Sequence, residues 1–394
     1  MSELDYLPFD CDNHYCEALD AFTRHLDPKW APRTVMWCDM GGRKYHIIGG
    51  KVSFAVMNPT FNPIAKAGAM HDFFRGNPDR KDPLEFLRER EPIRPEYQNR
   101  EARLQVMDQQ GLEACWLFPT LGVLYEEPLK QDPEAVTVLF RAFNRWLLDD
   151  WGLCYQNRIM AAPYIPMADP KFAKSELEWA LKNGARVVCM RPAAAFTAKG
   201  SMSPADPAFD GFWGLANEAG ITIVAHASDS GYTSNGYVND EFSANIGANK
   251  MGPTVKTFAF ERAACDFLIT LVFDKLFERF PNLRIASIEN GAEFLPDMFR
   301  KIASNANKFP RYFKEDPLDL FRRNVWINPF WEDNVYKVEE LMGAERVLFG
   351  SDWPHIEGMP EPLAYVAELR DFDENKKRRI LRDNVCELNQ LRPT

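Results

Sequence analysis

The chain has 394 residues, of which 46% are hydrophobic and 26% are charged, and its formal net charge is −10. This length suits one large α/β domain or two smaller ones, and the mixture of apolar and charged residues excludes wholesale disorder. The acidic balance and the lack of a basic stripe argue against a nucleic-acid partner. No run of 18 apolar residues occurs, so we expect no membrane-spanning helix and no membrane partner.

The N-terminal residues and the cysteines bear on the cellular compartment. The first residues, MSELDYLPFD, are acidic and lack the apolar core of a secretory signal. The eight cysteines are scattered, and none forms a C-x-x-C pair. Reduced and mostly buried thiols are typical of this pattern, so we expect a cytoplasmic protein.

Short apolar runs recur along the chain, and segments able to form helices lie between them. The first predicted strand ends near Asp12, and the other seven cover residues 113–119, 158–166, 185–193, 221–228, 283–291, 324–330 and 346–354. Near-continuous apolar runs are typical of strands buried on both faces of a parallel sheet. Helices are predicted at residues 174–184 and 212–220, where apolar residues recur three and four apart before a glycine.

Eight strand–helix units predict an α/β protein with a (β/α)8 barrel, the TIM barrel fold. A doubly wound sheet is the alternative, but no glycine-rich phosphate-binding turn follows any predicted strand. Roughly a hundred residues separate the first two strands, and within them residues 43–56 predict a hairpin that turns at Gly49 and Gly50. We therefore expect a single domain over residues 1–394, with an insertion at about 40–98 that serves as a lid or a dimer contact.

Oxygen and imidazole donors recur at the predicted strand ends, where side chains line the active site of such a barrel. Asp12 and His14 end the first strand, and residues i and i+2 of a strand point to the same face. His226 ends the fifth strand, Glu289 the sixth and Asp352 the eighth. Two imidazoles and two carboxylates, from Asp12, His14, His226 and Asp352, suit one divalent metal ion, Zn²⁺ or Mn²⁺.

Proton transfer is the second task that these residues can perform. We expect Asp352 and Glu289 to be catalytic, since either carboxylate can take a proton from a water that the metal ion activates. His355 is a further catalytic candidate, for proton transfer or for orienting Asp352. Simpler roles remain open: Asp352 as a helix N-cap, His226 as a hydrogen-bonded core residue, and Glu289 as the ion-pair partner of Arg191.

Substrate-binding candidates surround the predicted metal site. Arg191 ends the fourth strand and suits a substrate carboxylate, because a guanidinium group binds a carboxylate through two parallel hydrogen bonds. An internal salt bridge is the other interpretation of Arg191. Phe330, Trp331 and Trp353 either stack on an aromatic substrate or belong to the core. Glu17 lies three residues after His14, close enough to support the metal ligands or the substrate.

Four segments resemble one known family. DCDNHYCE, VAHAS, SIENGAEFLP and LFGSDWPH are similar to the corresponding segments of the amidohydrolase-related family (amidohydrolase 2), which includes aminocarboxymuconate semialdehyde decarboxylase. The resemblance implies a (β/α)8 barrel with a single divalent metal ion, a homodimer, and a role in the breakdown of aromatic compounds. By position it places metal ligands at Asp12, His14, His226 and Asp352, with Asp352 also carrying a proton.

Two departures from the family pattern affect the predicted reaction. The first-strand motif is D-x-H here, whereas H-x-H or E-x-H is common, and a carboxylate shifts preference toward a harder ion such as Mn²⁺. Glu289 lies where many family decarboxylases carry a histidine. The sequence therefore predicts a metal-dependent hydrolase of a small organic acid, aromatic or derived from ring cleavage. The alternatives are a metal-dependent, non-oxidative decarboxylase of an aromatic acid and a catalytically inactive binding barrel.

Overall fold

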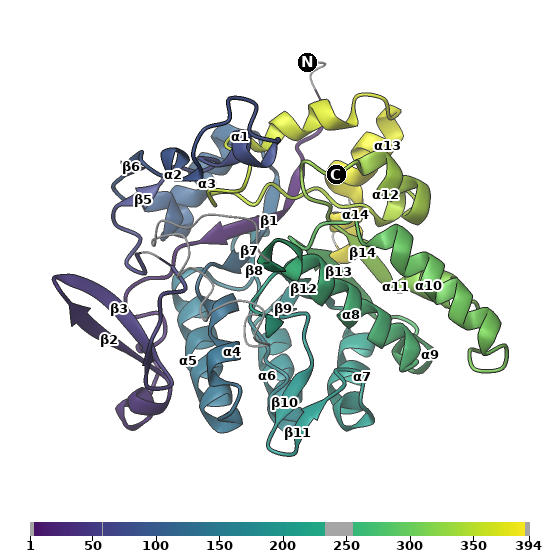
Figure 1. Ribbon diagram of the computed structural model, residues 1–394, viewed down its shortest axis with the longest axis horizontal. Helices are drawn as coiled ribbons and strands as arrows, with labels where there is room; N and C mark the ends of the chain where they lie inside the picture. The colour runs from purple at the N-terminus through teal and green to yellow at the C-terminus, as the bar shows by residue number, and fades with distance from the viewer. Residues whose placement is uncertain (1–3, 57, 233–254, 391–394) are drawn as a thin grey trace.

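Parallel strands lie at the centre of the molecule (Figure 1). The computed structural model describes residues 4–56, 58–232 and 255–390. The central strands are β1 (Phe9–Tyr15), β7 (Ala114–Pro119), β8 (Ile159–Ala161), β9 (Val187–Met190), β12 (Thr222–His226), β13 (Arg284–Ile288) and β14 (Val325–Ile327). Every residue of β1, β7, β8, β9 and β12 is buried, as the near-continuous apolar runs predicted.

These strands form two sheets that single bridges join into a ring. One sheet has the order β1-β7-β8 and the other the order β14-β13-β12-β9. A parallel bridge between Tyr164 and Cys189 connects the β8 region to β9. On the other side, residues 347–353 lie between β14 and β1 and bridge to both of them. Eight parallel segments therefore close on themselves, and the predicted (β/α)8 barrel is confirmed.

The eighth segment is less regular than the sequence predicted. Residues 346–354 form bridges and single hydrogen bonds, such as Leu348 N–H to Ile327 O at 2.8 Å and Cys11 N–H to Phe349 O at 2.9 Å, but no continuous strand. Asp352 interrupts the extended backbone with a φ of 56°, in the left-handed region that non-glycine residues rarely adopt. The first strand also runs three residues past its predicted end at Asp12, to Tyr15.

Helices cover the outside of the ring (Figure 1). Outside the insertion, the described helices are α3 (Arg100–Gln110), α4 (Glu126–Leu129), α5 (Pro133–Asp150), α6 (Pro170–Lys182), α7 (Asp210–Ala219), α8 (Ala259–Phe273), α9 (Leu276–Arg279), α10 (Leu295–Lys308), α11 (Pro317–Asn324), α12 (Val335–Met342), α13 (Glu374–Arg378) and α14 (Asn384–Leu388). The helix predicted at 174–184 begins earlier, because the Asp169 side chain caps it by accepting from Phe172 N–H. Gly220 ends α7 with a φ of 63°, as its sequence position predicted.

The long segment between β1 and α3 contains small antiparallel sheets. Its elements are β2 (Val35–Met40), β3 (Arg43–Ile48), β4 (Lys51–Val52), β5 (Ile64–Ala65), α1 (His71–Phe74), α2 (Pro83–Phe86) and β6 (Arg90–Glu91). The predicted turn at Gly49 and Gly50 is present, with φ values of 55° and 82°. The sequence did not predict β2, which pairs with the full length of β3. A further hairpin, β10 (Ala195–Thr197) with β11 (Gly200–Met202), follows β9.

This segment reaches the loop that follows the eighth segment of the ring. Gly68 N–H donates to His355 O at 2.8 Å, and Met70 N–H donates to Ile356 O at 2.7 Å. The His71 ring stacks on Trp331, with centroids 4.2 Å apart. The inserted residues are therefore fixed beside the carboxyl ends of the strands, where the predicted donors lie.

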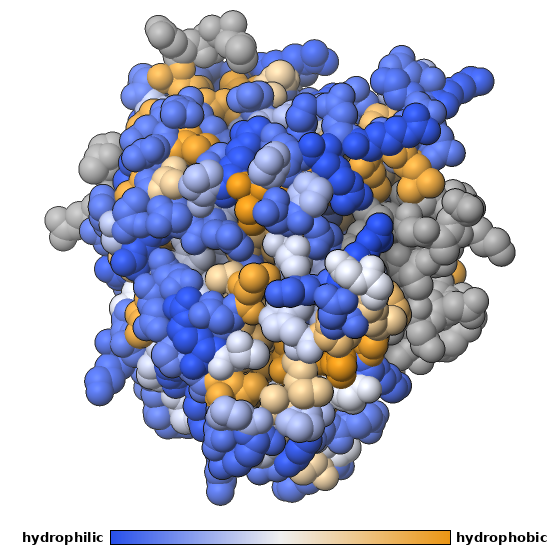
Figure 2. Space-filling model, turned by 90° about the vertical axis from the view of Figure 1, so that its left-hand side faces the viewer, coloured by the Kyte–Doolittle hydropathy of each residue, from blue (hydrophilic) through white to orange (hydrophobic). Residues whose placement is uncertain are grey.

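The molecular surface is mainly hydrophilic on the side that carries β2 and β3, with small apolar patches between polar residues (Figure 2). Met40 and Phe54 are among the exposed large apolar residues of the insertion. Within the described part of the chain, no helix combines the length and apolar character needed to cross a bilayer. The homodimer and the role of the insertion in it stay predictions.

Candidate metal centre and substrate pocket

Strand β1 presents its acid and imidazole on one face. Asp12 and His14 are buried and point into the ring, whereas Asn13 between them accepts a hydrogen bond from Arg103 Nη1 at 2.6 Å. Arg103 also donates to the backbone oxygen of His14 at 2.6 Å. The buried arginine therefore holds the outward side of the strand end while the D-x-H pair faces the centre.

The first strand and the eighth segment meet closely at this point. The Asp10 carboxylate accepts hydrogen bonds from Ser351 N–H at 3.0 Å and from Ser351 Oγ at 2.5 Å. A Cβ atom at Gly350 would lie only 2.4 Å from Asp12 Cβ, so glycine alone permits this approach. The Asp10 contacts and Gly350 together bring the donors of the two segments to one point.

Donors that β1, β12, β13 and the eighth segment supply meet there in two overlapping groups, which share His14 and Glu289. His14 Nε2 lies 3.3 Å from Asp12 Oδ1, 3.5 Å from Glu289 Oε2 and 3.3 Å from Asp352 Oδ1. His226 Nε2 lies 3.5 Å from Asp12 Oδ1 and 3.4 Å from Glu289 Oε2. The structure therefore groups three of the four predicted ligands, Asp12, His14 and His226, with Glu289, and it places the fourth, Asp352, in a second group beside His14 and Glu289.

The two histidines turn their acceptor nitrogens toward the carboxylates. His14 Nδ1 lies 3.2 Å from Pro119 O, and His226 Nδ1 lies 2.8 Å from Ala227 O. Each Nδ1 therefore carries the hydrogen, which leaves the Nε2 lone pair directed into the cluster. The buried Nε2 atoms, Asp12 Oδ1 and Asp352 Oδ1 have no hydrogen-bond partner in the described structure. Asp12, His14 and His226 form, with Glu289, one group whose donor atoms are close enough to hold a single cation, so the cluster fits the predicted single divalent metal ion.

Burial and the close contacts within the cluster shift the pKa values of His14, Asp12 and Asp352. Burial lowers the pKa of His14, but the contacts with Asp12 and Glu289 outweigh it and raise that pKa to about 10. Burial opposes ionisation of Asp12, yet the close contacts with His14 and His226 hold the pKa of Asp12 below its usual value. Burial and the neighbouring Glu289 raise the pKa of Asp352 well above its usual value.

His355 lies close enough to Asp352 to exchange a proton with it. His355 Nδ1 lies 2.7 Å from Asp352 Oδ1, and His355 Nε2 lies 3.0 Å from Thr120 Oγ1. The Thr120 hydroxyl donates to Tyr15 O at 2.8 Å, so it accepts from His355 Nε2. This contact leaves His355 Nδ1 facing Asp352, where a proton can pass between the two groups. Burial and the nearby His14 keep the pKa of His355 well below its usual value.

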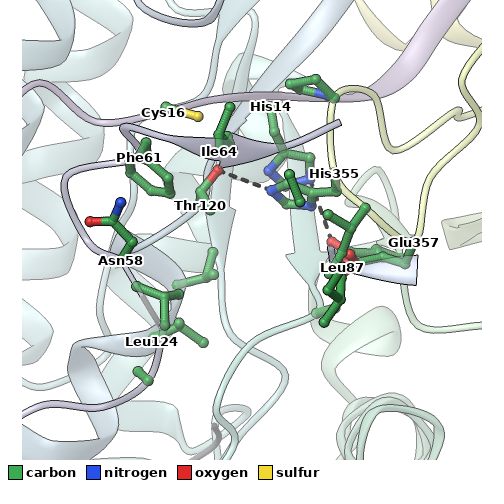
Figure 3. A pocket seen from close by; sticks show the side chains of 18 of the residues that line it. His14, Cys16, Asn58, Phe61, Ile64, Leu87, Thr120, Leu124, His355 and Glu357 are labelled. Atoms are coloured by element: carbon green, nitrogen blue, oxygen red, sulfur yellow. Dashed lines mark hydrogen bonds and ion pairs between the residues drawn. The ribbon is translucent and has the colours of Figure 1, made fainter. Parts of the chain in front are cut away.

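A cavity of about 250 Å³ opens onto His14, Glu289 and His355 (Figure 3). Its apolar lining comes largely from the insertion. The inserted residues that contribute apolar lining include Ala55, Val56, Phe61, Pro63, Ile64 and Leu87. The polar lining is sparse and includes Thr120, Ser228 and Glu357. Burial and the neighbouring Glu289 raise the pKa of Glu357 to about 7.

Arg191 does not line this cavity. Its Nη1 lies 2.6 Å from Glu127 Oε2 and 3.1 Å from Asp229 O, and its Nε lies 3.3 Å from Glu126 Oε1. These contacts are the internal salt bridge that the sequence left open as the second interpretation. They also correct the suggestion that Arg191 pairs with Glu289.

The other substrate-binding candidates lie around the cavity without lining it. Trp353 is buried against Tyr97, with ring centroids 5.4 Å apart, and Arg103 stacks over it. Phe330 is half-buried and packs against Gly291. Glu17 accepts hydrogen bonds from Leu121 and Gly122 N–H at 2.8 and 2.9 Å, so it fixes the loop after β7.

Sequence reasoning missed several residues of the site. Thr120 follows β7 directly, and the same strand-end rule that selected Asp352 would have found it. Glu357 lies beyond the eighth segment in an irregular loop, where no pattern marks it. Phe61 and Leu87 reach the cavity from the insertion, and nothing in their local sequence indicates which part of the barrel they approach.

A closed ring of parallel strands, with imidazole and carboxylate donors gathered at the carboxyl ends, defines a metal-dependent enzyme of the (β/α)8 type. The family model described as amidohydrolase matches residues 10–385, and the chain belongs to this family. An amidohydrolase from Mycobacterium avium subsp. paratuberculosis K-10 is 40% identical, with 99% of each chain covered and a TM-score of 0.92. The family resemblance seen in the sequence is therefore confirmed.

Two further comparisons concern decarboxylases. The 2-amino-3-carboxymuconate-6-semialdehyde decarboxylase of Dictyostelium discoideum is 26% identical over 136 residues, which is 33% of this chain and 37% of that protein. The match therefore spans little more than a third of that relative. A dihydroxybenzoic acid decarboxylase from Polaromonas sp. JS666, with bound manganese and the inhibitor 2-nitroresorcinol, is 20% identical. The alignment covers 83% of this chain and 94% of the decarboxylase, with a TM-score of 0.61. This comparison shows a likeness of fold.

Proposed function

We propose that this enzyme is a metal-dependent, non-oxidative decarboxylase of a small aromatic or ring-cleavage-derived acid. The observation that carries the proposal is the 2.7 Å contact between His355 Nδ1 and Asp352 Oδ1 beside the metal-ligand cluster, under a mainly apolar cavity. Decarboxylation of an aromatic ring needs a proton donor at the ring carbon and a positive charge near the carboxylate. The decarboxylase named among the curated relatives supports the same choice.

The cavity suits one substituted ring. An apolar cavity of about 150 Å³ is enough to hold benzene, so about 250 Å³ leaves room for a carboxylate and further substituents. Phe61 and Leu87 line the cavity from the insertion (Figure 3), which supports the predicted lid role. Burial under this apolar cover excludes water and strengthens the electrostatic interactions at the cluster.

The proposed mechanism assigns one role to each group. Asp12, His14, His226 and Asp352 would hold the cation, which supplies positive charge and Lewis acidity for a carboxylate and a neighbouring oxygen. The Asp352–His355 pair gives its proton to the ring carbon that bears the carboxylate. The bond between that carbon and the carboxylate then breaks, its electron pair returns to the ring, and CO₂ leaves. Thr120 keeps the His355 ring oriented during the transfer.

The sequence favoured hydrolysis because Glu289 replaces a sixth-strand histidine. In the structure, His355 supplies an imidazole to the same centre from the eighth segment, stacked on His14 with centroids 3.8 Å apart. Glu289 lies within 3.5 Å of both cluster histidines, so it is a poor choice for a free general base. Hydrolysis of an organic acid is therefore the alternative to be tested, and an inactive binding barrel is the third possibility.

The test is the stoichiometry of CO₂ release. Mn²⁺-loaded protein would be incubated with 2-amino-3-carboxymuconate-6-semialdehyde, which names the curated relative, and with 2,6-dihydroxybenzoate and 5-carboxyvanillate, which name two decarboxylases of similar fold at 22% and 20% identity. We expect one CO₂ for each substrate consumed, with a product that keeps its ring or chain otherwise intact. Consumption without CO₂ would favour hydrolysis. Saturable binding without any turnover would favour the inactive barrel.

A further inference from the structure

Glu289 is placed at the cluster by a backbone conformation that disfavours a glutamate. It follows β13 with a φ of 57°, in the left-handed region that non-glycine residues rarely adopt. The buried Asn290 side chain clamps this turn by donating to Ala225 O at 2.8 Å and to Ile288 O at 2.9 Å. The turn therefore fixes the direction of the Glu289 side chain toward β12 and β1.

The carboxylate of Glu289 meets only the cluster histidines among the ion pairs of the described residues. Its Oε2 lies 3.5 Å from His14 Nε2 and 3.4 Å from His226 Nε2. Both nitrogens are buried acceptors without a hydrogen-bond partner. Glu289 also belongs to both groups of side chains in the described structure whose donor atoms approach closely enough to hold one metal ion.

The separations match those of atoms that share a cation. Ligands about 2.1 Å from one metal ion lie roughly 3.0 to 3.5 Å apart when they are neighbours, from octahedral to tetrahedral geometry. The Glu289 separations fall in this range, as do the 3.3 Å between His14 and Asp12 and the 3.5 Å between His226 and Asp12. Glu289 thus has the same relation to the two imidazoles as the predicted ligand Asp12.

We propose that Glu289 is a further ligand of the metal ion, and that this fifth protein donor makes the site favour Mn²⁺ relative to Zn²⁺. A tetrahedral ion has room for four donors, whereas Mn²⁺ takes up to six and prefers carboxylate oxygen. Three carboxylates with two imidazoles form a harder and more anionic set than the four predicted ligands alone. The inference rests on the metal site of the proposed function and is independent of the reaction.

The test compares metal affinities of three proteins: wild type, Glu289→Gln and Glu357→Gln. Metal-free samples would be dialysed to equilibrium against Mn²⁺ alone and Zn²⁺ alone, and the bound metal measured by plasma mass spectrometry. We expect Glu289→Gln to raise the Kd for Mn²⁺ at least about tenfold and the Kd for Zn²⁺ less than about threefold. Glu357→Gln removes a nearby charge without removing a proposed ligand, so it should change both values by a similar small factor.

Two outcomes contradict the proposal. If Glu289→Gln changes both affinities no more than Glu357→Gln does, Glu289 is not a ligand. If it weakens both metals equally, the selectivity claim is wrong. X-ray absorption of the Mn²⁺-loaded wild type gives a check that needs no variant: about six nitrogen and oxygen neighbours support the proposal, and about four contradict it. Because these experiments measure metal binding, their outcome is independent of the outcome of the CO₂ assay.

Discussion

His355 contacts the metal-ligand cluster through Asp352, and its other ring nitrogen is held by Thr120. We expect His355→Asn to lower kcat by about 10- to 100-fold, because the proposed proton donor, the Asp352–His355 pair, loses its imidazole. Metal content and KM should change little, since His355 is not one of the proposed ligands. The measurement is steady-state kinetics beside plasma mass spectrometry, with His25→Asn as the matched control at an exposed ion pair. Loss of the metal ion in His355→Asn would contradict this division of roles.

Arg191 is a buried charged residue, and we expect it to contribute to stability rather than to substrate binding. It forms ion pairs with Glu126 and Glu127 on α4, and all three side chains are at most 5% exposed. Arg191→Met would leave two buried carboxylates without this partner, so we expect the free energy of unfolding to fall by about 3 to 5 kcal/mol. Urea denaturation measures this loss, with Arg141→Met as the control at a side chain that is 54% exposed. Unchanged stability with a raised KM would instead identify Arg191 as a substrate-binding residue.

At the scale of elements, unusual backbone conformations and candidate site residues occur together at the strand ends. Glu289 and Asp352 each adopt a positive φ directly after the sixth and eighth segments of the ring. Local sequence predicted that polar residues end these segments, but it did not predict the reversed backbone. The left-handed turn ends the ladder and directs the carboxylate inward, and this depends on contacts such as Asn290 with Ala225 that lie far apart in the sequence.

Asp333 joins the loops after β13 and β14, because one carboxylate oxygen accepts from Ala292 N–H at 2.9 Å and from Phe330 N–H at 3.0 Å. Burial and the neighbouring Glu332 raise its pKa to about 7. A raised carboxyl pKa means that the folded chain binds the proton more tightly than the unfolded chain, whose value is about 3.9. The contribution of Asp333 to stability is therefore largest below pH 4 and falls as the pH rises to 7.

Asp333→Asn should remove this pH dependence, because an amide oxygen can accept both hydrogen bonds without ionising. We expect the stability of the variant relative to wild type to increase between pH 4 and pH 7 and to level off above. Urea denaturation at a series of pH values measures the difference, with Asp371→Asn as an exposed control. A difference that stays constant across this range would show that Asp333 ionises normally in the folded protein.

At the scale of the whole molecule, the barrel was predictable because its signal is local. Strands buried on both faces leave apolar runs, and β7, β9, β12 and β13 lie within the ranges that these runs predicted. The candidate ligands could be selected for the same reason, since each lies at the end of such a run or directly after it. The approach of the insertion to the catalytic end was not predictable, because its contacts, such as Gly68 with His355, join segments nearly 300 residues apart.

Metal content is the most direct test of the account, because the proposed ligands, proton transfer and pocket all depend on a cation at one place. The protein would be purified without added metal and without a histidine tag, and analysed by plasma mass spectrometry beside Asp12→Ala and His226→Ala. We expect about one Mn²⁺ or Zn²⁺ per chain in the wild type, lost in both variants while their folded structure persists. A wild-type protein that contains no divalent metal and binds none when Mn²⁺ or Zn²⁺ is supplied would contradict the account.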